Sequence, residues 1–104
     1  MVRHIVFFRF EDPAVNIPIV RDSLYALRDK IPQIVDMQIG ADFMHSQRSS
    51  DMVLIVDFKN REDLEIYDKN PDHAKARVYI HAHRTDRGPS ILNSDGNLQG
   101  RFPV

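Results

Sequence analysis

Two histidines and one tyrosine stand where they could transfer protons: His4, His73 and Tyr67. His4 lies in an alternating apolar stretch and would share one strand face with Val6 and Phe8. Burial there favours a neutral imidazole, which suits a general base or a donor of a lone pair to a ligand. The same position also fits a core histidine that bonds one neighbouring group. The residues alone leave both interpretations open.

His73 follows Asn70-Pro71 and would lie in the first turn of a helix. The positive end of the helix dipole and nearby apolar surface both disfavour imidazolium, so a neutral, base-competent ring is one interpretation. The other is a supporting residue that helps to fix the Asn70-Pro71 turn. Tyr67 could donate its hydroxyl to a substrate carbonyl, or pack as a core aromatic with a solvated tip. If the helix crosses the covered face of the first strand, His4, His73 and Tyr67 share one pocket.

The remaining histidines do not form a metal-binding pattern. His81 and His83 are two residues apart, and on a helix such residues diverge by about 200°, so they cannot readily bind one ion. His45 stands in a polar connection. The lack of cysteine excludes disulfides and thiolate-held metals. The absence of G-x-S-x-G, P-loop, dinucleotide and H-E-x-x-H motifs argues against hydrolase and nucleotide-driven chemistry. We therefore expect neither a metal nor an organic cofactor.

Length and charge narrow the class of protein. The sequence has 104 residues, with 14 Lys and Arg against 15 Asp and Glu. We expect one domain over residues 1–104, with a core over 2–93 and an extended tail over 94–104. The formal net charge of −1 offers no electrostatic reason to bind nucleic acid or an anionic membrane. No apolar run approaches the roughly 20 residues that cross a bilayer. These features predict a cytoplasmic globular protein.

Four segments have the composition of strands. Residues 2–10 alternate in a way that predicts a strand with both faces at least partly covered. Residues 34–43 predict a second strand with one polar face. Residues 51–58 predict a third, whose nearly unbroken apolar run argues for a central position in the sheet. Residues 89–93 predict the last.

The first helix is indicated by apolar residues at three- and four-residue steps up to Ile31. Asn16 is its expected N-cap, which would place Pro18 in the first turn, where its missing N–H has no helical partner to lose. Pro32 is expected to end it, because proline disfavours helical geometry at the preceding residue.

Two caps in quick succession predict a pair of later helices. Asn60 precedes an acidic first turn, and Asn70 precedes Pro71 at the first helical position. The second of these helices should run to about His81 or His83. It should bury some of its small and branched apolar residues, namely Ala74, Val78 and Ala82.

The resulting order is strand, helix, strand, strand, helix pair, strand. This β-α-β-β-α-β order predicts an α+β fold, a ferredoxin-like sandwich with helices on one face of a four-stranded antiparallel sheet. The strands carry apolar residues on both faces, yet the helices cover only one. We therefore expect a homodimer that buries the open sheet face, most simply through a two-fold axis.

An ordered set of residues resembles the stress-responsive A/B barrel domain, also called the dimeric α+β barrel. The matching segments are Arg3-His4-Ile5-Val6, Leu27-x3-Ile31-Pro32-x-Ile34, Gly40, Asp51-x2-Leu54-x3-Phe58 and Asp63-Leu64-x2-Tyr67-x3-Pro71-x-His73. The resemblance implies a ferredoxin-like protomer whose sheet packs against a second copy to close a barrel.

The resemblance also bears on chemistry. Similar plant proteins act as polyketide cyclases without metal or organic cofactor, using histidines in a pocket between sheet and helices. Their pattern matches His4, His73 and Tyr67 here. This chain departs at Asn70, where the family often has a histidine, which keeps the cap but removes an ionisable group.

Together these features predict a small homodimeric barrel protein that binds a small apolar or aromatic molecule, with histidine acid/base chemistry. In an aldol-type cyclisation one histidine would remove a carbon-bound proton while Tyr67 or the other histidine stabilised the enolate oxygen. The alternatives are a non-catalytic, stress-related binding or assembly module and a cofactor-free monooxygenase of the neighbouring barrel families.

Overall fold

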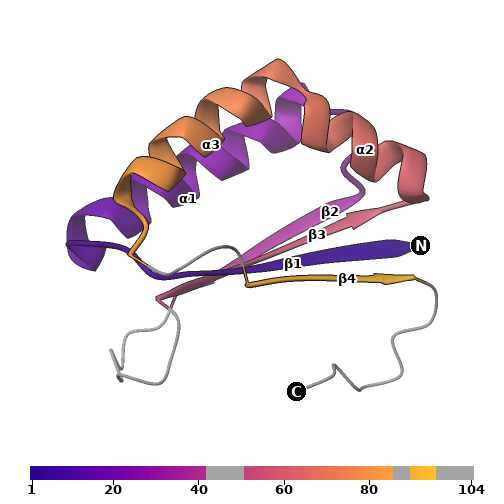
Figure 1. The fold of residues 1–104 in the computed structure, drawn as a ribbon. Helices are drawn as coiled ribbons and strands as arrows, with labels where there is room; N and C mark the ends of the chain where they lie inside the picture. The colour runs from indigo at the N-terminus through magenta and orange to yellow at the C-terminus, as the bar shows by residue number, and fades with distance from the viewer. Residues whose placement is uncertain (42–50, 86–89, 96–104) are drawn as a thin grey trace.

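The computed structural model describes residues 1–41, 51–85 and 90–95, the last segment by its backbone. Helices and strands follow in the order β-α-β-β-α-α-β (Figure 1). Their bounds are β1 (Val2–Phe8), α1 (Pro13–Lys30), β2 (Asp36–Ala41), β3 (Met52–Phe58), α2 (Arg61–Lys69), α3 (Pro71–His83) and β4 (Ser90–Asp95). The predicted order is confirmed. The second strand begins at Asp36, two residues later than expected, and its predicted end at Phe43 lies outside the described residues, as does Pro89.

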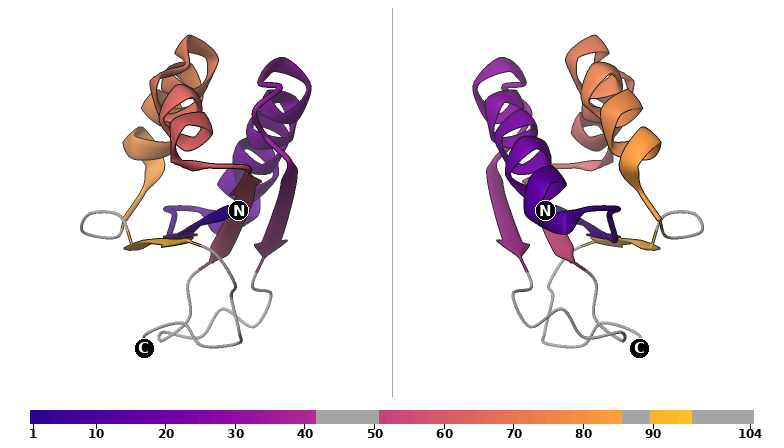
Figure 2. Two further views of the ribbon diagram at one scale, coloured as in Figure 1. Left: turned by 90° about the vertical axis from the view of Figure 1, so that its right-hand side faces the viewer. Right: turned by 90° about the vertical axis from the view of Figure 1, so that its left-hand side faces the viewer.

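The four strands form one antiparallel sheet in the order β2-β3-β1-β4. β3 is therefore an interior strand, as its unbroken apolar run predicted. All three helices pack on the same face of the sheet, with α1 beside the α2–α3 pair (Figures 1 and 2). This is the ferredoxin-like α+β sandwich.

Strand register decides which side chains face the helices. His4 pairs with Val56 and Val6 with Leu54, and directly paired residues share a face. Val56 and Leu54 belong to the core between sheet and helices, so His4 lies on the helix-covered side. The intervening residues face the other way, and Ile5 pairs there with Ile55.

The first helix begins earlier than the sequence predicted. Its N-cap is Asp12, in the left-handed region at φ 44°, and Pro13 occupies the first helical position. The prediction of Asn16 as N-cap was wrong: Asn16 lies buried inside α1, where its amide donates to the Glu11 carbonyl and its oxygen accepts from the Tyr79 hydroxyl at 2.9 Å. Asn16 thus bonds α1 to α3, a contact that its own neighbours in sequence do not signal.

Because α1 begins at Pro13, Pro18 lies inside the helix and not in its first turn as predicted.

The other predicted helix boundaries are confirmed. Helix α1 ends before Pro32. Asn60 accepts a hydrogen bond from the Asp63 amide at 2.9 Å, and Asn70 accepts one from the Asp72 amide at 2.8 Å. Both asparagine caps are therefore confirmed.

The buried face of α3 differs from the predicted one. Ala74, Val78 and Ala82 are exposed, Val78 at 73%, whereas Ile80 is buried. The face that α3 turns toward the sheet carries polar residues at helical spacing together with Ile80. An apolar stripe alone is therefore the wrong signal for this helix, because its inner face lines a cavity with polar residues while only Ile80 is fully buried in the core.

Candidate functional site

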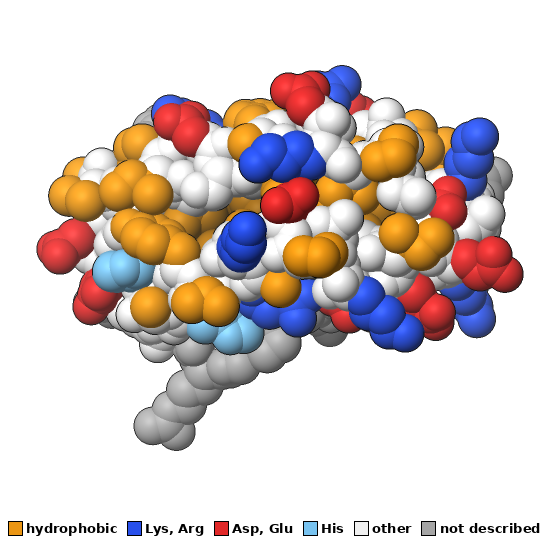
Figure 3. Space-filling view, turned by 90° about the horizontal axis from the view of Figure 1, so that it is seen from above, with side chains coloured by type: hydrophobic (Ala, Val, Ile, Leu, Met, Phe, Trp, Pro, Cys, Tyr) orange, Lys and Arg blue, Asp and Glu red, His pale blue; other side chains and the backbone are white. Residues whose placement is uncertain are grey.

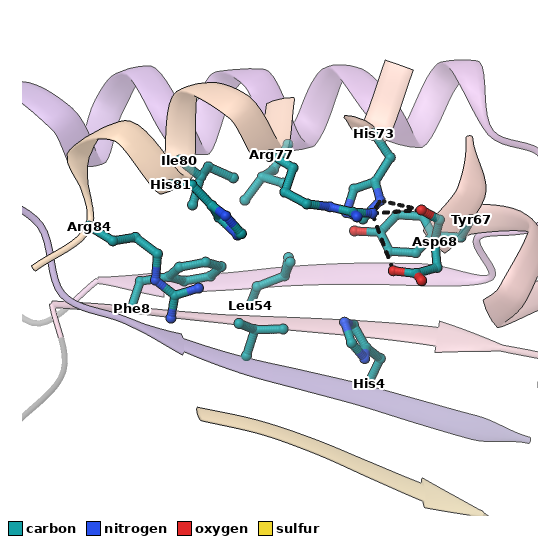
Figure 4. Close-up of a pocket in the computed structure, with 12 residues that line it drawn as sticks. His4, Phe8, Leu54, Tyr67, Asp68, His73, Arg77, Ile80, His81 and Arg84 are labelled. Carbon is teal, nitrogen blue, oxygen red and sulfur yellow. Dashed lines mark hydrogen bonds and ion pairs between the residues drawn. The ribbon is translucent and has the colours of Figure 1, made fainter. Parts of the chain in front are cut away.

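A cavity of about 230 Å³ lies between the helix-covered face of the sheet and the α2–α3 pair (Figure 4). Its apolar lining comprises Val6, Phe8, Leu24, Leu54 and Ile80. Its polar lining comprises His4, Tyr67, Asp68, His73, Arg77, His81 and Arg84. The structure thus brings the three expected residues, His4, His73 and Tyr67, to one cavity.

Tyr67 lies between the two histidines. Its ring stacks on that of His73, with centroids 4.1 Å apart, and meets the His4 ring edge-on at 6.2 Å. Phe58 packs against it with ring centroids 5.1 Å apart. The side chain is only 1% exposed, so these contacts fix its orientation within the core.

The Tyr67 hydroxyl is the most informative atom of the site. It is buried and has no hydrogen-bond partner among the described residues. In Figure 4 it points toward the middle of the cavity. Burial raises the pKa of the Tyr67 phenol well above its ordinary value of 10.0, so the group stays protonated. An unpaired buried hydroxyl costs stability, about 1–3 kcal/mol, and a ligand oxygen in the cavity would relieve that cost.

Arg77 fixes the state of His73. The guanidinium lies 2.9 Å from His73 Nδ1, and since arginine can only donate, Nδ1 must accept. The neutral ring then carries its proton on Nε2. Arg77 is itself held by Asp68, through the backbone carbonyl at 2.6 Å and the carboxylate at 3.3 Å. His73 therefore offers an N–H donor through Nε2, while its acceptor nitrogen is occupied.

Burial, followed by the nearby positive charge of Arg77, lowers the pKa of His73 from its ordinary value of 6.5. The unfolded chain thus binds a proton on this residue at a higher pH than the folded chain. The contribution to stability is full above about pH 6.5 and is lost as the pH falls through the folded-state value.

Replacing Arg77 by methionine should raise the pKa of His73 toward 6.5. Methionine is an unbranched side chain, and it removes the positive charge that lies beside the imidazole ring. The substitution should also allow the neutral ring to carry its proton on either nitrogen, since Arg77 no longer donates to Nδ1. Nitrogen-15 and proton NMR titration of the imidazole reports both quantities. Replacing Lys75, on the same helix but outside the cavity lining, by methionine is the control. An unchanged His73 titration in Arg77→Met would contradict this assignment.

The other two described histidines differ in position. His81 lines the cavity, whereas His83 Nδ1 bonds Glu11 Oε1 at 2.9 Å and its ring packs against Tyr79. His45 lies outside the described residues.

Within residues 1–41 and 51–85, no three histidine, aspartate or glutamate side chains gather as a metal site. None of the described helices is both long and apolar enough to span a membrane.

Sequence reasoning missed Arg77 and Arg84 as cavity residues. Both lie on the inner side of the α3 segment, at helical spacing from His73. The signal was present in that spacing. Counting in helical steps from His73, and not from an apolar stripe, identifies Arg77 and Arg84 as residues of the inner face.

Fold and cavity together define a ferredoxin-like α+β protein with a histidine- and tyrosine-lined pocket between sheet and helices. The family model described as the stress responsive A/B barrel domain matches residues 2–88, and the chain belongs to that family. A comparison with curated proteins gave no match.

Solved structures share the fold at low sequence identity. A dimeric protein of unknown function from Bacteroides fragilis has TM-score 0.79 and 22% identity, covering 91% of this chain and 95% of that chain. A dimeric ferredoxin-like protein of unknown function from Thermobifida fusca has TM-score 0.76 and 24% identity, covering 89% and 88%. A hydroxynitrile lyase from Passiflora edulis has TM-score 0.78 and 18% identity, covering 98% and 96%.

Proposed function

We propose that this protein binds a small apolar or aromatic carbonyl compound and removes the proton from the carbon next to its carbonyl group. The observation that carries the proposal is the Tyr67 hydroxyl, which is buried in a cavity beside His73 and His4 and has no hydrogen-bond partner within the described part of the chain. It supplies a preorganised donor where a carbonyl oxygen would become an enolate.

The roles follow from the hydrogen-bonding state of each group. Tyr67 keeps its proton, and His73 has its acceptor nitrogen occupied by Arg77, so both can only donate to the ligand oxygen. His4 is then the base: one ring nitrogen takes the carbon-bound proton. The C–H electron pair forms the carbon–carbon double bond of the enolate, and the π pair of the carbonyl group moves onto its oxygen. Returning the proton, or attack of the enolate carbon on a second carbonyl, completes an exchange or an aldol-type cyclisation.

The non-catalytic alternative uses the same cavity for binding alone. One fold neighbour is described as a hydroxynitrile lyase, so this fold does support enzymes, but a shared fold does not assign a reaction. The apolar lining and the buried donor serve binding in either case. Proton exchange on a bound ketone therefore separates the two functions.

Replacing Tyr67 by phenylalanine should have opposite effects on stability and on binding. The free energy of unfolding should rise by about 1 kcal/mol, because an unsatisfied buried hydroxyl is removed. Affinity for acetophenone should fall about tenfold, because its carbonyl loses a buried donor. Urea denaturation and NMR titration measure the two quantities.

The matched control is Tyr25→Phe, since Tyr25 is 39% exposed on α1. It should change neither quantity. Acetophenone binding that is equally tight in wild type and Tyr67→Phe would contradict the role of this hydroxyl, as would failure of wild type to bind any aryl ketone.

We also propose that the protein is a homodimer through the open face of the sheet. No described helix covers this face, on which Phe7 is 39% exposed and Val53 and Ile55 are half-buried (Figure 2). The outer surface of the helix layer, in contrast, mixes charged with apolar side chains (Figure 3). Two fold neighbours are described as dimeric, which supports the same arrangement here.

A further inference from the structure

One histidine of the cavity has no role in the proposed proton transfer. His81 lines the cavity from α3, and its imidazole ring points toward the sheet (Figure 4). Tyr67 and His73 lie further along the cavity, above His4. His81 therefore supplies a second polar position, separate from the groups that would hold a carbonyl oxygen.

The hydrogen-bonding state of His81 differs from that of the other two histidines of α3. His73 Nδ1 accepts from Arg77, and His83 Nδ1 lies 2.9 Å from Glu11 Oε1. No hydrogen bond joins the His81 ring to another residue of the described segments. A neutral imidazole has one donor and one acceptor nitrogen, so this ring can bond a ligand group that both accepts and donates. A hydroxyl group does both.

Apolar side chains separate the two polar positions. Val6 and Leu54 are paired across β1 and β3 on the sheet side of the cavity, and Ile80 lines it from α3. All three are at most 5% exposed, so a ligand placed between them exchanges water for an apolar surface. The ligand thus needs an apolar section between its two polar groups.

The length of that section follows from the helix. His73 and His81 are eight residues apart on α3, which corresponds to about 12 Å along the helix axis. Two hydrogen bonds of about 2.8 Å each occupy part of this distance. A benzene ring with oxygen-bearing groups at opposite positions spans the remainder. A dry cavity of about 150 Å³ is known to hold benzene, so a cavity of about 230 Å³ accommodates one such ring.

From this arrangement we infer that the natural ligand is an aromatic ketone whose ring carries a hydroxyl group opposite the carbonyl side chain, and that His81 binds this hydroxyl. The carbonyl end of the inference rests on the proposed function. The hydroxyl end rests on the position of His81 in the cavity.

A pair of ketones of the same shape tests the hydroxyl group. We expect 1-(4-hydroxyphenyl)propan-2-one to bind wild type about fivefold more tightly than 1-(4-methylphenyl)propan-2-one. The methyl group has nearly the size of the hydroxyl but forms no hydrogen bond. The phenol stays protonated near neutral pH, so the comparison involves no charge. NMR titration measures both affinities.

Substitutions assign the preference to a side chain. His81→Leu should abolish it, whereas His81→Gln, which keeps a donor and an acceptor, should retain most of it. His83→Leu is the matched control and should preserve it, because His83 lies on the same helix but outside the cavity lining. Tyr67→Phe should weaken the binding of both ketones by a similar factor and leave their ratio unchanged, since both contain the carbonyl group that Tyr67 would hold.

Three results would overturn the inference: equal affinity of the two ketones for wild type, a preference that survives His81→Leu, or a preference that disappears in Tyr67→Phe. The comparison in wild type decides the question even if His81→Leu fails to fold.

Failure of the proposed function would give a different result. A wild type that prefers the hydroxyl ketone but does not exchange the protons next to its carbonyl group for deuterium would retain the hydroxyl site and exclude the proton transfer. If neither ketone binds at millimolar concentration, both proposals are contradicted.

Discussion

His4→Gln is expected to slow removal of the proton next to the ligand carbonyl by about 10²–10⁴-fold, the usual contribution of a positioned general base. Glutamine keeps a polar side chain of similar reach but cannot accept a proton. Tyr67 and His73 would still hold the carbonyl oxygen, so ligand affinity should change far less than the rate. A large loss of rate with a small loss of affinity distinguishes a base from a binding residue.

The rate is measured by NMR as exchange of the methyl protons of acetophenone, which lie next to its carbonyl group, for deuterium in D₂O. His83→Gln is the matched control, because His83 pairs with Glu11 and does not line the cavity. It should exchange protons at the wild-type rate. A His4→Gln protein that is as fast as wild type would remove His4 from the mechanism. A wild type that binds the ketone without exchanging its protons would establish the non-catalytic function instead.

Ile55→Glu is expected to convert a homodimer into monomers. Ile55 pairs with Gln38 on one side and with Ile5 on the other, at the middle of the open sheet face. Burying an unpaired carboxylate costs several kcal/mol, and a two-fold interface contains the substitution twice. The dimer dissociation constant should therefore rise by at least about 10³-fold.

Sedimentation equilibrium at micromolar concentration measures this change. Ile66→Glu is the control, since Ile66 is 47% exposed on α2 and lies on the helix layer. It should leave the dimer intact. A wild type that is monomeric under these conditions, or an Ile55→Glu protein that stays dimeric, would show that this face is not the interface.

Features governed by near neighbours in the chain could be predicted. Asn60 and Asn70 each accept a hydrogen bond from an amide two or three residues further on, so a few letters of sequence carry the cap. Alternation in residues 2–8 likewise predicted that His4 shares one strand face with Val6 and Phe8. Caps and alternation depend on residues that are close in the sequence.

Asn16 shows where such reasoning stops. Its type and position before an apolar pattern favoured a cap, yet its oxygen accepts from Tyr79, 63 residues away in sequence. A cap and a buried bond between two helices need the same amide group. Only the packing of α1 against α3 decides between them.

The sequence by itself determined the order of strands and helices and the family, because periodicity, caps and motif spacing are local properties of the chain. It also singled out His4, Tyr67 and His73 as candidate site residues, and all three line one cavity. Tertiary structure alone decided that the Tyr67 hydroxyl has no partner among the described residues and that Arg77 fixes the tautomer of His73. A cavity is space that packing leaves unfilled. Its existence and its lining depend on how α3 lies over β1, and no residue pattern records that distance.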